Sequence, residues 1–284
     1  MNADHYAQCA QLAMLLELSA GPKPGNVDRC HDHPEMGFRH FLASAVSAYP
    51  VFRKAAASQA GIGSLILEAV EGWRRFGLSC NTHFGEVTLL IPLTMAAGQE
   101  GDLMDALLRV LEGSTVEDAI RFYEAFQLSG ARVARVDQLS LADRSAEEEI
   151  RRRELSLIDL MRLSKGHDLI AREWSNGFAR SFQLSALLRE RVAELGPNDG
   201  LVLTFLEALA GHEDSLIQAK HGLDKAREVS KRAKAALCGD DPIQLARELD
   251  SAFLKEGINP GSTADIMAAS LFIALLDGCF EVIL

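Results

Sequence analysis

The sequence is poor in aromatic residues, which make up only 6% of its 284 positions. Hydrophobic residues nevertheless account for 48%, so the core has to be built mainly from Leu, Ala, Ile and Val. Helices that pack closely through Ala suit this composition better than an aromatic-rich β-sandwich does. Strand pairs joined by hairpin turns are also missing from the pattern. We therefore predict an all-α fold, with a single globular multi-helix domain over residues 1–284.

Basic residues are scarce as well. Lys and Arg number 29 against 40 Asp and Glu, which gives a formal net charge of -11. Nucleic acids and anionic membranes are bound through basic patches, so we expect neither as a partner. A small anionic ligand needs only a local cluster of donors and is compatible with this charge.

Long apolar runs and paired cysteines are absent too. No run approaches the roughly 18 apolar residues of a membrane span, and the N-terminus lacks the basic segment and cleavage site of a signal peptide. The five cysteines form no C-x-x-C pair, which favours a reduced, cytoplasmic protein with free thiols. Apolar helix faces would allow a homodimer, although no pattern in the sequence decides this.

Apolar residues recur at helical spacing through most of the chain. Asp102 and Ser114 are the expected N-caps of two of the helices, and Pro50 is expected to kink or break another. The apolar run at 87–98 is compatible with a strand or a buried helix, and the charged run at 143–154 with a solvated helix or a mobile excursion. The other segments predicted to be helical are 6–19, 38–57, 62–76, 102–112, 115–128, 156–163, 167–194, 199–213, 215–237, 242–256 and 263–280.

Four polar, glycine-containing loops lie between these helices. Each has an ordinary explanation as a helix cap or connection. Together they indicate more, because helix starts present N–H groups to anions and carboxylates accompany every loop. A Mg²⁺–polyphosphate site needs carboxylates, helix N-termini and a lysine, since the metal bridges negative side chains to phosphates. We therefore expect a phosphorylated, nucleotide-like substrate at the loops 21–36, 79–86, 212–222 and 257–266.

The first loop offers a lysine, a glycine and several carboxylates. Lys23 can contact phosphate oxygens, and Gly25 lets the backbone come close to a ligand. Asp28, Asp32 and Glu35 could hold a divalent cation. A helix–helix connection with surface charges is the alternative interpretation.

The same loop contains a zinc-like group of residues, Cys30, His31 and His33. Closed structural zinc sites need four ligands from two separated pairs. A fourth ligand at compatible spacing is missing from the sequence, so we do not predict zinc.

The second loop precedes an apolar helix. Asn81 or Thr82 can cap that helix, whose free N–H groups and positive dipole end favour an anion. His83 could donate to a phosphate or to a leaving base. Capping without any ligand explains the loop equally well.

The third and fourth loops repeat this design. Asp214 and Lys220 flank a helix start and are six positions apart, so they need not share one helix face. Gly261 and Ser262 stand at the start of the last apolar helix, and Asp265 lies in its first turn. Carboxylates are favoured at such positions without any ligand, and Pro-Gly before Ser-Thr is a common capping sequence.

Taken in order, five segments resemble the triphosphoribosyl-dephospho-CoA synthase family over nearly the whole chain. This family is all-α, and its reaction joins the triphosphoribosyl group of ATP to the ribose of 3'-dephospho-CoA and releases adenine. The segments are PKPGNVD (22–28), H-x-E-M-x-F with F-L-x-S-A (33–45), NTHFG (81–85), D-S-x-x-x-x-K-x-G (214–222) and NPGSTAD (259–265).

The resemblance implies roles for individual residues, with Mg²⁺ as cofactor and ATP as substrate. A carboxylate would stabilise positive charge at the ribose anomeric carbon, and a donor would help adenine leave. Implied contacts to the substrates are Lys23, Gly25, Asn81, Thr82, Lys220, Asn259, Gly261 and Ser262. Implied catalytic residues are Asp214, Asp265 and His83, and implied metal ligands are Asp28, Asp214 and Asp265.

The sequence also departs from the usual family pattern. His33-Pro34-Glu35-Met36-Gly37 replaces H-x-D-M-D, and Lys220 stands where Arg is common. The segments EEEIRRRE and HDLIAREWSNGF are similar to a branch found in archaea and in bacteria with archaeal-type one-carbon metabolism. This branch makes a second acceptor an alternative, namely glycosyl transfer in tetrahydromethanopterin-type cofactor synthesis. An ADP-ribosyl hydrolase-like enzyme, which transfers to water, and a nucleotide-sensing module without turnover are alternatives from other classes.

Overall fold

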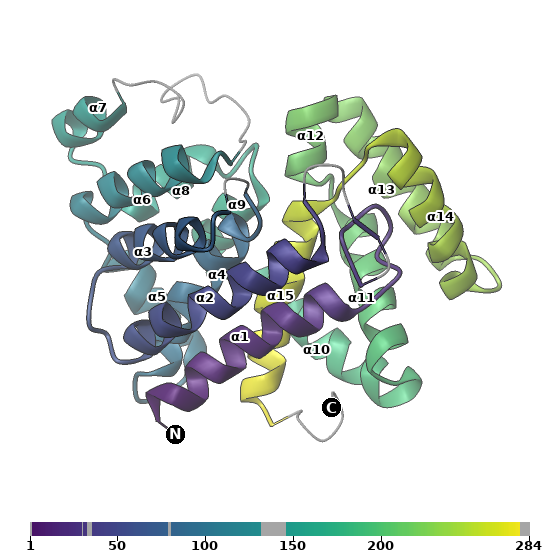
Figure 1. The fold of residues 1–284 in the computed structure, drawn as a ribbon, viewed down its shortest axis with the longest axis horizontal. Helices are drawn as coiled ribbons and strands as arrows, with labels where there is room; N and C mark the ends of the chain where they lie inside the picture. The colour runs from purple at the N-terminus through teal and green to yellow at the C-terminus, as the bar shows by residue number, and fades with distance from the viewer. Residues whose placement is uncertain (1, 30, 33–35, 79–80, 132–145, 279–284) are drawn as a thin grey trace. The chain divides into compact units, whose positions relative to one another are not determined.

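A computed structural model describes residues 2–29, 31–32, 36–78, 81–131 and 146–278. These residues form fifteen α-helices and no β-strand (Figure 1), so the predicted all-α fold is confirmed. None of the helices in this described part of the chain is both long enough and apolar enough to cross a bilayer.

The chain packs into two compact units, and it passes between them several times. Unit 1 comprises residues 1–12, 40–131 and 135–179, and unit 2 comprises residues 13–39, 132–134 and 180–284. Each unit is described by itself below. The single domain expected from the sequence stays a prediction.

Unit 1 is built around α4, a helix that is apolar on nearly every face and therefore buried all round. Helix α3 packs on α4 and α6, and α8 packs on α6 and α9. Its helices are the start of α1 (Ala3–Ser19), most of α2 (Phe38–Ala56), α3 (Ile62–Arg75), α4 (Phe84–Ala97), α5 (Leu103–Glu112), α6 (Val116–Ser129), α7 (Ala146–Arg153), α8 (Leu157–Ser164) and α9 (Leu169–Asn176).

Unit 2 contains the end of α1, the loop at 20–37 and the remaining helices. Its buried helix is α15, which contacts α11 and α12, while α13 packs against α11, α12 and α14. The bounds are α10 (Ala179–Leu195), α11 (Pro197–Gly211), α12 (Ser215–His221), α13 (Leu223–Leu237), α14 (Pro242–Glu256) and α15 (Gly261–Leu276).

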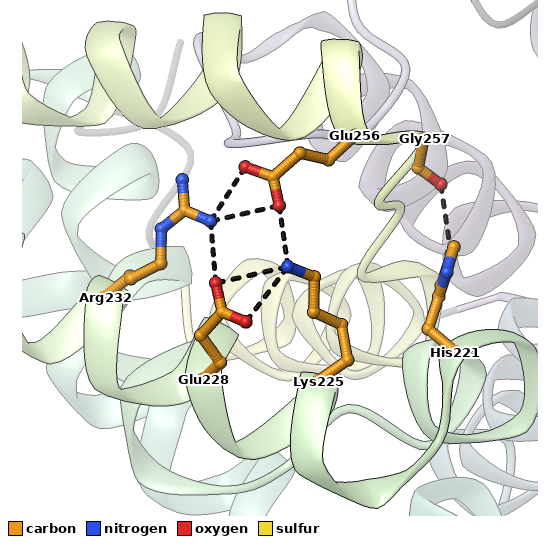
Figure 2. A network of polar contacts seen from close by, with 6 residues as sticks. All are labelled: His221, Lys225, Glu228, Arg232, Glu256 and Gly257. Atoms are coloured by element: carbon orange, nitrogen blue, oxygen red, sulfur yellow. Dashed lines mark hydrogen bonds and ion pairs between the residues drawn. The ribbon is translucent and has the colours of Figure 1, made fainter.

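A charged network joins α13 to α14 on the surface of unit 2 (Figure 2). Lys225 and Arg232 of α13 both bind Glu256 at the end of α14, with N–O distances of 2.8 and 2.9 Å. Glu228 lies between the two cations and binds each of them. All four side chains are between 28% and 48% exposed, so this network is a surface feature and lies outside the core.

Three helix boundaries differ from the sequence prediction. Helix α2 continues through Pro50, so the expected kink or break is not a break, and the kink stays a prediction. The predicted helix over 167–194 is two helices, α9 and α10, and the one over 215–237 is α12 and α13. The chain turns at Gly177 (φ 71°) and Gly222 (φ 87°), conformations that glycine adopts at little cost and that periodicity of the apolar residues cannot reveal.

Of the two predicted N-caps, Asp102 is confirmed and Ser114 is wrong. Asp102 caps α5 by accepting hydrogen bonds from the backbone N–H groups of Met104 and Asp105. Helix α6, however, is capped by Thr115 and not by Ser114. Thr115 forms a reciprocal capping box with a residue in the third position of the helix, while the Ser114 hydroxyl instead accepts from Ile158 N, 3.0 Å away. Thr115 is favoured over Ser114 as the N-cap because the capping box satisfies two N–H groups that have no partner within the helix.

The structure also decides the conformation of two ambiguous segments and the thiol state of two cysteines. The run at 87–98 lies in the buried helix α4, and the described part of the charged run, residues 146–153, is the solvated helix α7. Cys9 and Cys238 are free thiols, and burial raises the pKa of Cys9 to about 11, so Cys9 is an unreactive thiol at neutral pH. Cys30, Cys80 and Cys279 lie outside the described residues.

Candidate functional site

Lys23, in the first loop, is fully buried in unit 2. Its ammonium binds the carboxylate of Glu17 and also donates to the Glu17 carbonyl. Burial raises the pKa of Glu17, and the neighbouring Lys23 charge acts in the opposite direction. A buried ion pair is strongly disrupted when either partner is removed. Lys23 therefore has an internal partner in addition to the phosphate contact that the resemblance implies.

Gly25 is held by a side chain from α14. Its backbone N–H donates to Asp250 Oδ1 at 2.9 Å, and Asp250 is only 2% exposed. Gly25 has φ 76°, and a Cβ at this position would lie 2.5 Å from the carbonyl oxygen of Ile258. Both the backbone conformation and the close approach require glycine here. The N–H group expected to face a ligand is therefore engaged by the protein's own carboxylate.

Asp28 and Asp250 flank one edge of the His31 ring. His31 Nδ1 lies 3.1 Å from Asp250 Oδ2 and 3.5 Å from Asp28 Oδ1. Both carboxylates are buried, whereas the His31 side chain is 39% exposed. Glu17 belongs to the same cluster, since the Asp28 charge contributes to raising the pKa of Glu17. The first loop thus folds over a group of buried carboxylates, accompanied by one lysine and one histidine.

A pair of asparagines joins the first loop to the fourth. Asn26 Nδ2 donates to Asn259 Oδ1 at 3.2 Å, and both residues are buried. Asn259 lies directly before α15. The predicted substrate contact at Asn259 is thereby brought to the loop that carries Lys23 and Gly25.

Asp214, in the third loop, ties the starts of two helices together. Its Oδ1 accepts hydrogen bonds from Leu216 N and Ile217 N in the first turn of α12. Its Oδ2 accepts from the backbone N–H of Thr263 at 2.7 Å and from the Thr263 hydroxyl at 2.8 Å. Burial raises the pKa of Asp214, and these four hydrogen bonds act in the opposite direction. Four donors fill the acceptor positions of a carboxylate, so Asp214 suits a positioning role better than a metal ligand.

The other predicted residues of these loops lie around the same junction. Gly261 is the first residue of α15, and the Ser262 hydroxyl accepts from the Ser215 hydroxyl at 2.8 Å. Asp265 is half-buried in α15 just beyond its first turn, and not within that turn as the sequence predicted, because the helix already begins at Gly261. Lys220 is exposed in the last turn of α12. The first, third and fourth loops are therefore linked in unit 2 by direct hydrogen bonds.

The second loop belongs to unit 1. His83 is the N-cap residue of α4 and makes no side-chain cap hydrogen bond. Of the two predicted capping side chains, Asn81 accepts from the first helical N–H, that of Phe84, at 3.1 Å. His83 is fully buried, with Nδ1 on the hydroxyl of Ser44 and Nε2 3.7 Å from Glu86 Oε2. The ring also packs edge-on against Phe41, at 4.8 Å between centroids. Ser44 of α2 thus contacts Nδ1 of His83, whereas Glu86 of α4 lies beside Nε2 beyond hydrogen-bond distance.

Thr82 lies between these two residues and is half-buried. Its hydroxyl oxygen is buried and has no hydrogen-bond partner within the described part of the protein. Buried polar groups normally have a hydrogen-bond partner, and the Thr82 hydroxyl has none among the described residues. This is compatible with the predicted substrate contact at Thr82.

The described residues contain no group of three His, Cys, Asp or Glu side chains arranged to hold a metal ion. Of the zinc-like residues, Cys30 and His33 lie outside the described ranges, as does Glu35. For Mg²⁺, Asp28 beside Asp250 provides the buried carboxylate oxygens that the ion prefers. Asp214 fits this role poorly, because its oxygens already accept four hydrogen bonds. Mg²⁺ stays a prediction.

Several residues of this region were not found from the sequence. Glu17 could have been noticed, because a carboxylate within the apolar stretch AMLLELS has to be buried and paired. Glu86 gives the same signal, because it stands at the start of the apolar run of α4. Asp250 and Ser44 carry no such signal, since each looks like an ordinary polar residue of an amphipathic helix. Only their partners in distant segments distinguish them.

The fold and the site define an all-helical protein in which polar, glycine-containing loops bring buried carboxylates and a buried lysine together with the segment before α15. The family model of CitG, ATP:dephospho-CoA triphosphoribosyl transferase, matches residues 3–282. The chain belongs to this family of transferases, and it is an enzyme.

Relatives from bacteria and archaea agree with this assignment. The chain is 26% identical over 281 residues to a protein of Pseudomonas putida assigned as a 2-(5''-triphosphoribosyl)-3'-dephosphocoenzyme-A synthase, covering 95% of this chain and 94% of the relative. A protein of Azotobacter vinelandii with the same assignment is also 26% identical, with 97% and 92% covered. A crystal structure from Archaeoglobus fulgidus, assigned as a triphosphoribosyl-dephospho-coA synthase, superposes with a TM-score of 0.70 at 31% identity, over 84% of this chain and 99% of that one.

Proposed function

We propose that this protein transfers the triphosphoribosyl group of ATP to a ribose hydroxyl of 3'-dephospho-CoA and releases adenine. The observation that carries the proposal is the family match over residues 3–282. It is supported by the hydrogen bonds that bring the first, third and fourth family motifs together in unit 2.

The reaction sets clear demands on the protein. The bond between the ribose C1' of ATP and adenine N9 breaks, its electron pair leaves with adenine, and adenine takes up a proton. The acceptor oxygen forms the new bond to C1' and its hydroxyl proton is lost. Positive charge builds up at C1' in the transition state, so a nearby carboxylate and a donor for the leaving base lower the barrier.

Asp265 is the carboxylate that we propose for C1'. It is half-buried in α15 just beyond the first turn, and Asp214 fixes that first turn through Thr263, two residues before Asp265. Asp214 then acts as a positioning residue for Asp265. His83, held by Ser44 and lying beside Glu86, is the proposed donor for adenine.

The triphosphate needs positive charge. Lys23 and Lys220 are the lysines of the family motifs, and we propose Lys220, which is exposed, as the more direct contact. Lys23, paired with Glu17, instead keeps the first loop in place. When bound, Mg²⁺ would neutralise phosphate charge, and Asp28 is the residue that we propose to hold it.

An assay for free adenine tests this proposal. The protein is incubated with ATP, Mg²⁺ and 3'-dephospho-CoA, adenine is quantified by liquid chromatography, and the adduct is identified by mass spectrometry. Replacing Asp265 by Asn is expected to lower kcat about 100-fold. Asp224→Asn is the matched control, because Asp224 is a fully exposed first-turn residue of α13. ATP that is bound but unchanged with every acceptor would favour a nucleotide-binding module instead.

A second acceptor has one supporting observation. The identity to the archaeal protein, 31%, exceeds the 26% to the bacterial relatives, in line with the archaeal-type branch suggested by the sequence. A tetrahydromethanopterin-type acceptor is therefore tested in parallel. Adenine release with water alone would indicate an ADP-ribosyl hydrolase-like enzyme.

The proposal also includes the setting of the enzyme. We place it in the cytoplasm, in cofactor biosynthesis connected with one-carbon metabolism, on the grounds of its five cysteines without a C-x-x-C pair and its segments similar to the archaeal-type branch. A homodimer is tested by the mass of the protein in solution, measured by light scattering.

A further inference from the structure

Asn198, in the first turn of α11, is a residue of unit 2 that lies outside the five family motifs. Its side chain pairs with the backbone of Gly21, since Oδ1 accepts from Gly21 N at 3.1 Å and Nδ2 donates to the Gly21 carbonyl at 3.0 Å. Oδ1 also accepts from Arg29 at 3.4 Å, and Nδ2 donates to Asp199 at 2.9 Å. The two donor and two acceptor positions of the amide are therefore all in use, which fixes its orientation.

This one amide holds both ends of the motif PKPGNVD (22–28). Gly21 stands directly before the motif and Arg29 directly after it. The middle of the motif is held separately, by hydrogen bonds to α14 and to the segment before α15. Because Asn198 belongs to α11, the two ends of the motif are fixed relative to that helix.

Gly21 in turn lies against the carboxylate of Asp28. A Cβ at this position would overlap Asp28 Oδ2 and would lie 2.9 Å from Asp28 Cγ. Asp28 is buried, and its other oxygen, Oδ1, accepts from His31 N at 3.0 Å. The φ angle of Gly21 is not positive, so the space taken by the Asp28 carboxylate is what requires glycine here.

We propose that Asn198 is a positioning residue for substrate binding, which sets the Asp28 carboxylate through the backbone of Gly21. Asn198 fixes Gly21, and Gly21 forms the surface against which the carboxylate rests. The role of Asp28 towards ATP and Mg²⁺ rests on the proposed function. Since Asn198 acts on this carboxylate and not on Asp265, its loss should weaken the binding of ATP more than it slows the breaking of the bond.

Removing the amide tests the link between Asn198 and binding. We measure the Kd of ATP in the presence of Mg²⁺ by titration calorimetry, and KM and kcat from adenine release. Asn198→Ala is expected to raise the Kd and the KM of ATP about tenfold and to leave kcat within about threefold. Ser230→Ala is the matched control, because it removes a 2.9 Å hydrogen bond to the Ala210 carbonyl at the other end of α11. It should lower stability without changing the Kd.

A double-mutant cycle tests whether Asn198 acts through Asp28. In the unaltered protein, Asn198→Ala should raise the Kd of ATP about tenfold. In the Asp28→Asn background the same change should raise the Kd less than about twofold, because the group that it displaces is already gone. A purely structural role of Asn198 would give the same factor in both backgrounds. Urea denaturation of each variant establishes that it is folded.

Gly21→Ala reaches the same carboxylate from the other side. The added methyl group meets Asp28 while Asn198 still holds the backbone, so Asp28 has to move, and the Kd of ATP is expected to rise at least about tenfold. Gly166→Ala is the matched control, because its Cβ would meet open space and its φ is not positive. This pair of variants decides the proposal if Asp28→Asn does not fold.

The outcomes are distinct. An unchanged Kd in Asn198→Ala, an equal rise in both backgrounds of the cycle, or an equal rise in Ser230→Ala overturns the positioning role. An unchanged Kd in Gly21→Ala also overturns it. If the unaltered protein binds ATP but releases no adenine with any acceptor, the proposed function fails, while the comparison of Kd values still decides the role of Asn198.

Discussion

The starts of α15 and α4 are two versions of the same design. Both helices are apolar on almost every face and are buried in their units, and both follow a polar loop that contains glycine or asparagine. At α15, the carboxylate of Asp214 accepts from the first-turn N–H of Thr263. At α4, the neutral amide of Asn81 accepts from Phe84 N.

This difference shows that an anion-binding helix start can be filled by the protein itself. The partial positive charge of a helix N-terminus attracts any nearby anion, and a side-chain carboxylate is always present. Asp214 occupies that place at α15 and thereby joins α12 to α15. At α4 the acceptor of the first N–H is neutral, and the carboxylate of Glu86 lies within the first turn, so a phosphate at this start stays a prediction.

The largest effect on the free energy of unfolding is expected when the Asp214 carboxylate at the start of α15 is replaced. Replacing Asp214 by Asn turns an amide NH₂ towards buried donors, so we expect the free energy of unfolding to fall by about 2–4 kcal/mol. Urea denaturation measures this change. The control is Asp241→Asn at the exposed cap of α14, where Asn caps as well as Asp and the change should be small. Equal effects at both positions would remove the distinction between the two kinds of cap.

The next effect concerns Gly25, which brings the first loop against the segment before α15. Ala at this position is expected to lower the free energy of unfolding by about 2–3 kcal/mol, because φ is positive and Cβ meets the Ile258 carbonyl. Gly257→Ala is a matched control with φ 68° and open space around Cβ, for which only the conformational cost of a left-handed residue remains, about 1 kcal/mol. Thermal or urea unfolding of both variants separates the cost of the contact between Cβ and the Ile258 carbonyl from the conformational cost. Equal losses of unfolding free energy in the two variants would contradict a cost of that contact.

A negative charge introduced at the start of α4 tests directly how this start differs from that of α15. Asn81→Asp keeps a good cap, so the free energy of unfolding should change little. If this start accepts a phosphate, the added negative charge repels it, and the Kd of ATP should rise about tenfold. Calorimetric titration measures the Kd. Unchanged ATP affinity with retained stability would mean that no phosphate binds at the start of α4, as at the start of α15.

The smallest effect is expected on the surface network between α13 and α14 (Figure 2). Hydrogen bonds from Lys225 and Arg232 lower the pKa of Glu256 below its usual value. A lowered carboxyl pKa stabilises the folded state above the unfolded pKa of 4.5, and this stability is lost as the pH falls through the folded pKa.

Because these side chains are partly exposed and screened by salt, Glu256→Gln should cost less than about 1 kcal/mol of the free energy of unfolding at pH 7. The difference between the variant and the unaltered protein should shrink as the pH falls below 4.5 and through the lowered pKa of folded Glu256, as urea denaturation at several pH values would reveal. A difference that does not shrink as the pH is lowered would contradict the ion-pair origin.

Much of the fold could be predicted from the sequence, because helices and their caps depend on neighbours three or four positions away. The periodicity of apolar residues located most helices, and the caps Asp102 and Asn81 were foreseen for the same reason. The boundaries at Gly177 and Gly222 were missed, since apolar spacing continues across both glycines although the chain turns there. Ser114 was mistaken for a cap because Ser and Thr stand side by side, and only the reciprocal bond of Thr115 decides between them.

The sequence by itself determined an all-helical enzyme with four polar loops and the family to which their motifs point, because those signals are local in the chain. The tertiary structure alone decided what each polar group binds. Asp214 and Thr263 are 49 positions apart, and Gly25 and Asp250 are 225 apart. No local pattern encodes such pairs, since they form only when burial brings distant segments together and leaves each buried N–H group and each carboxylate to find a partner.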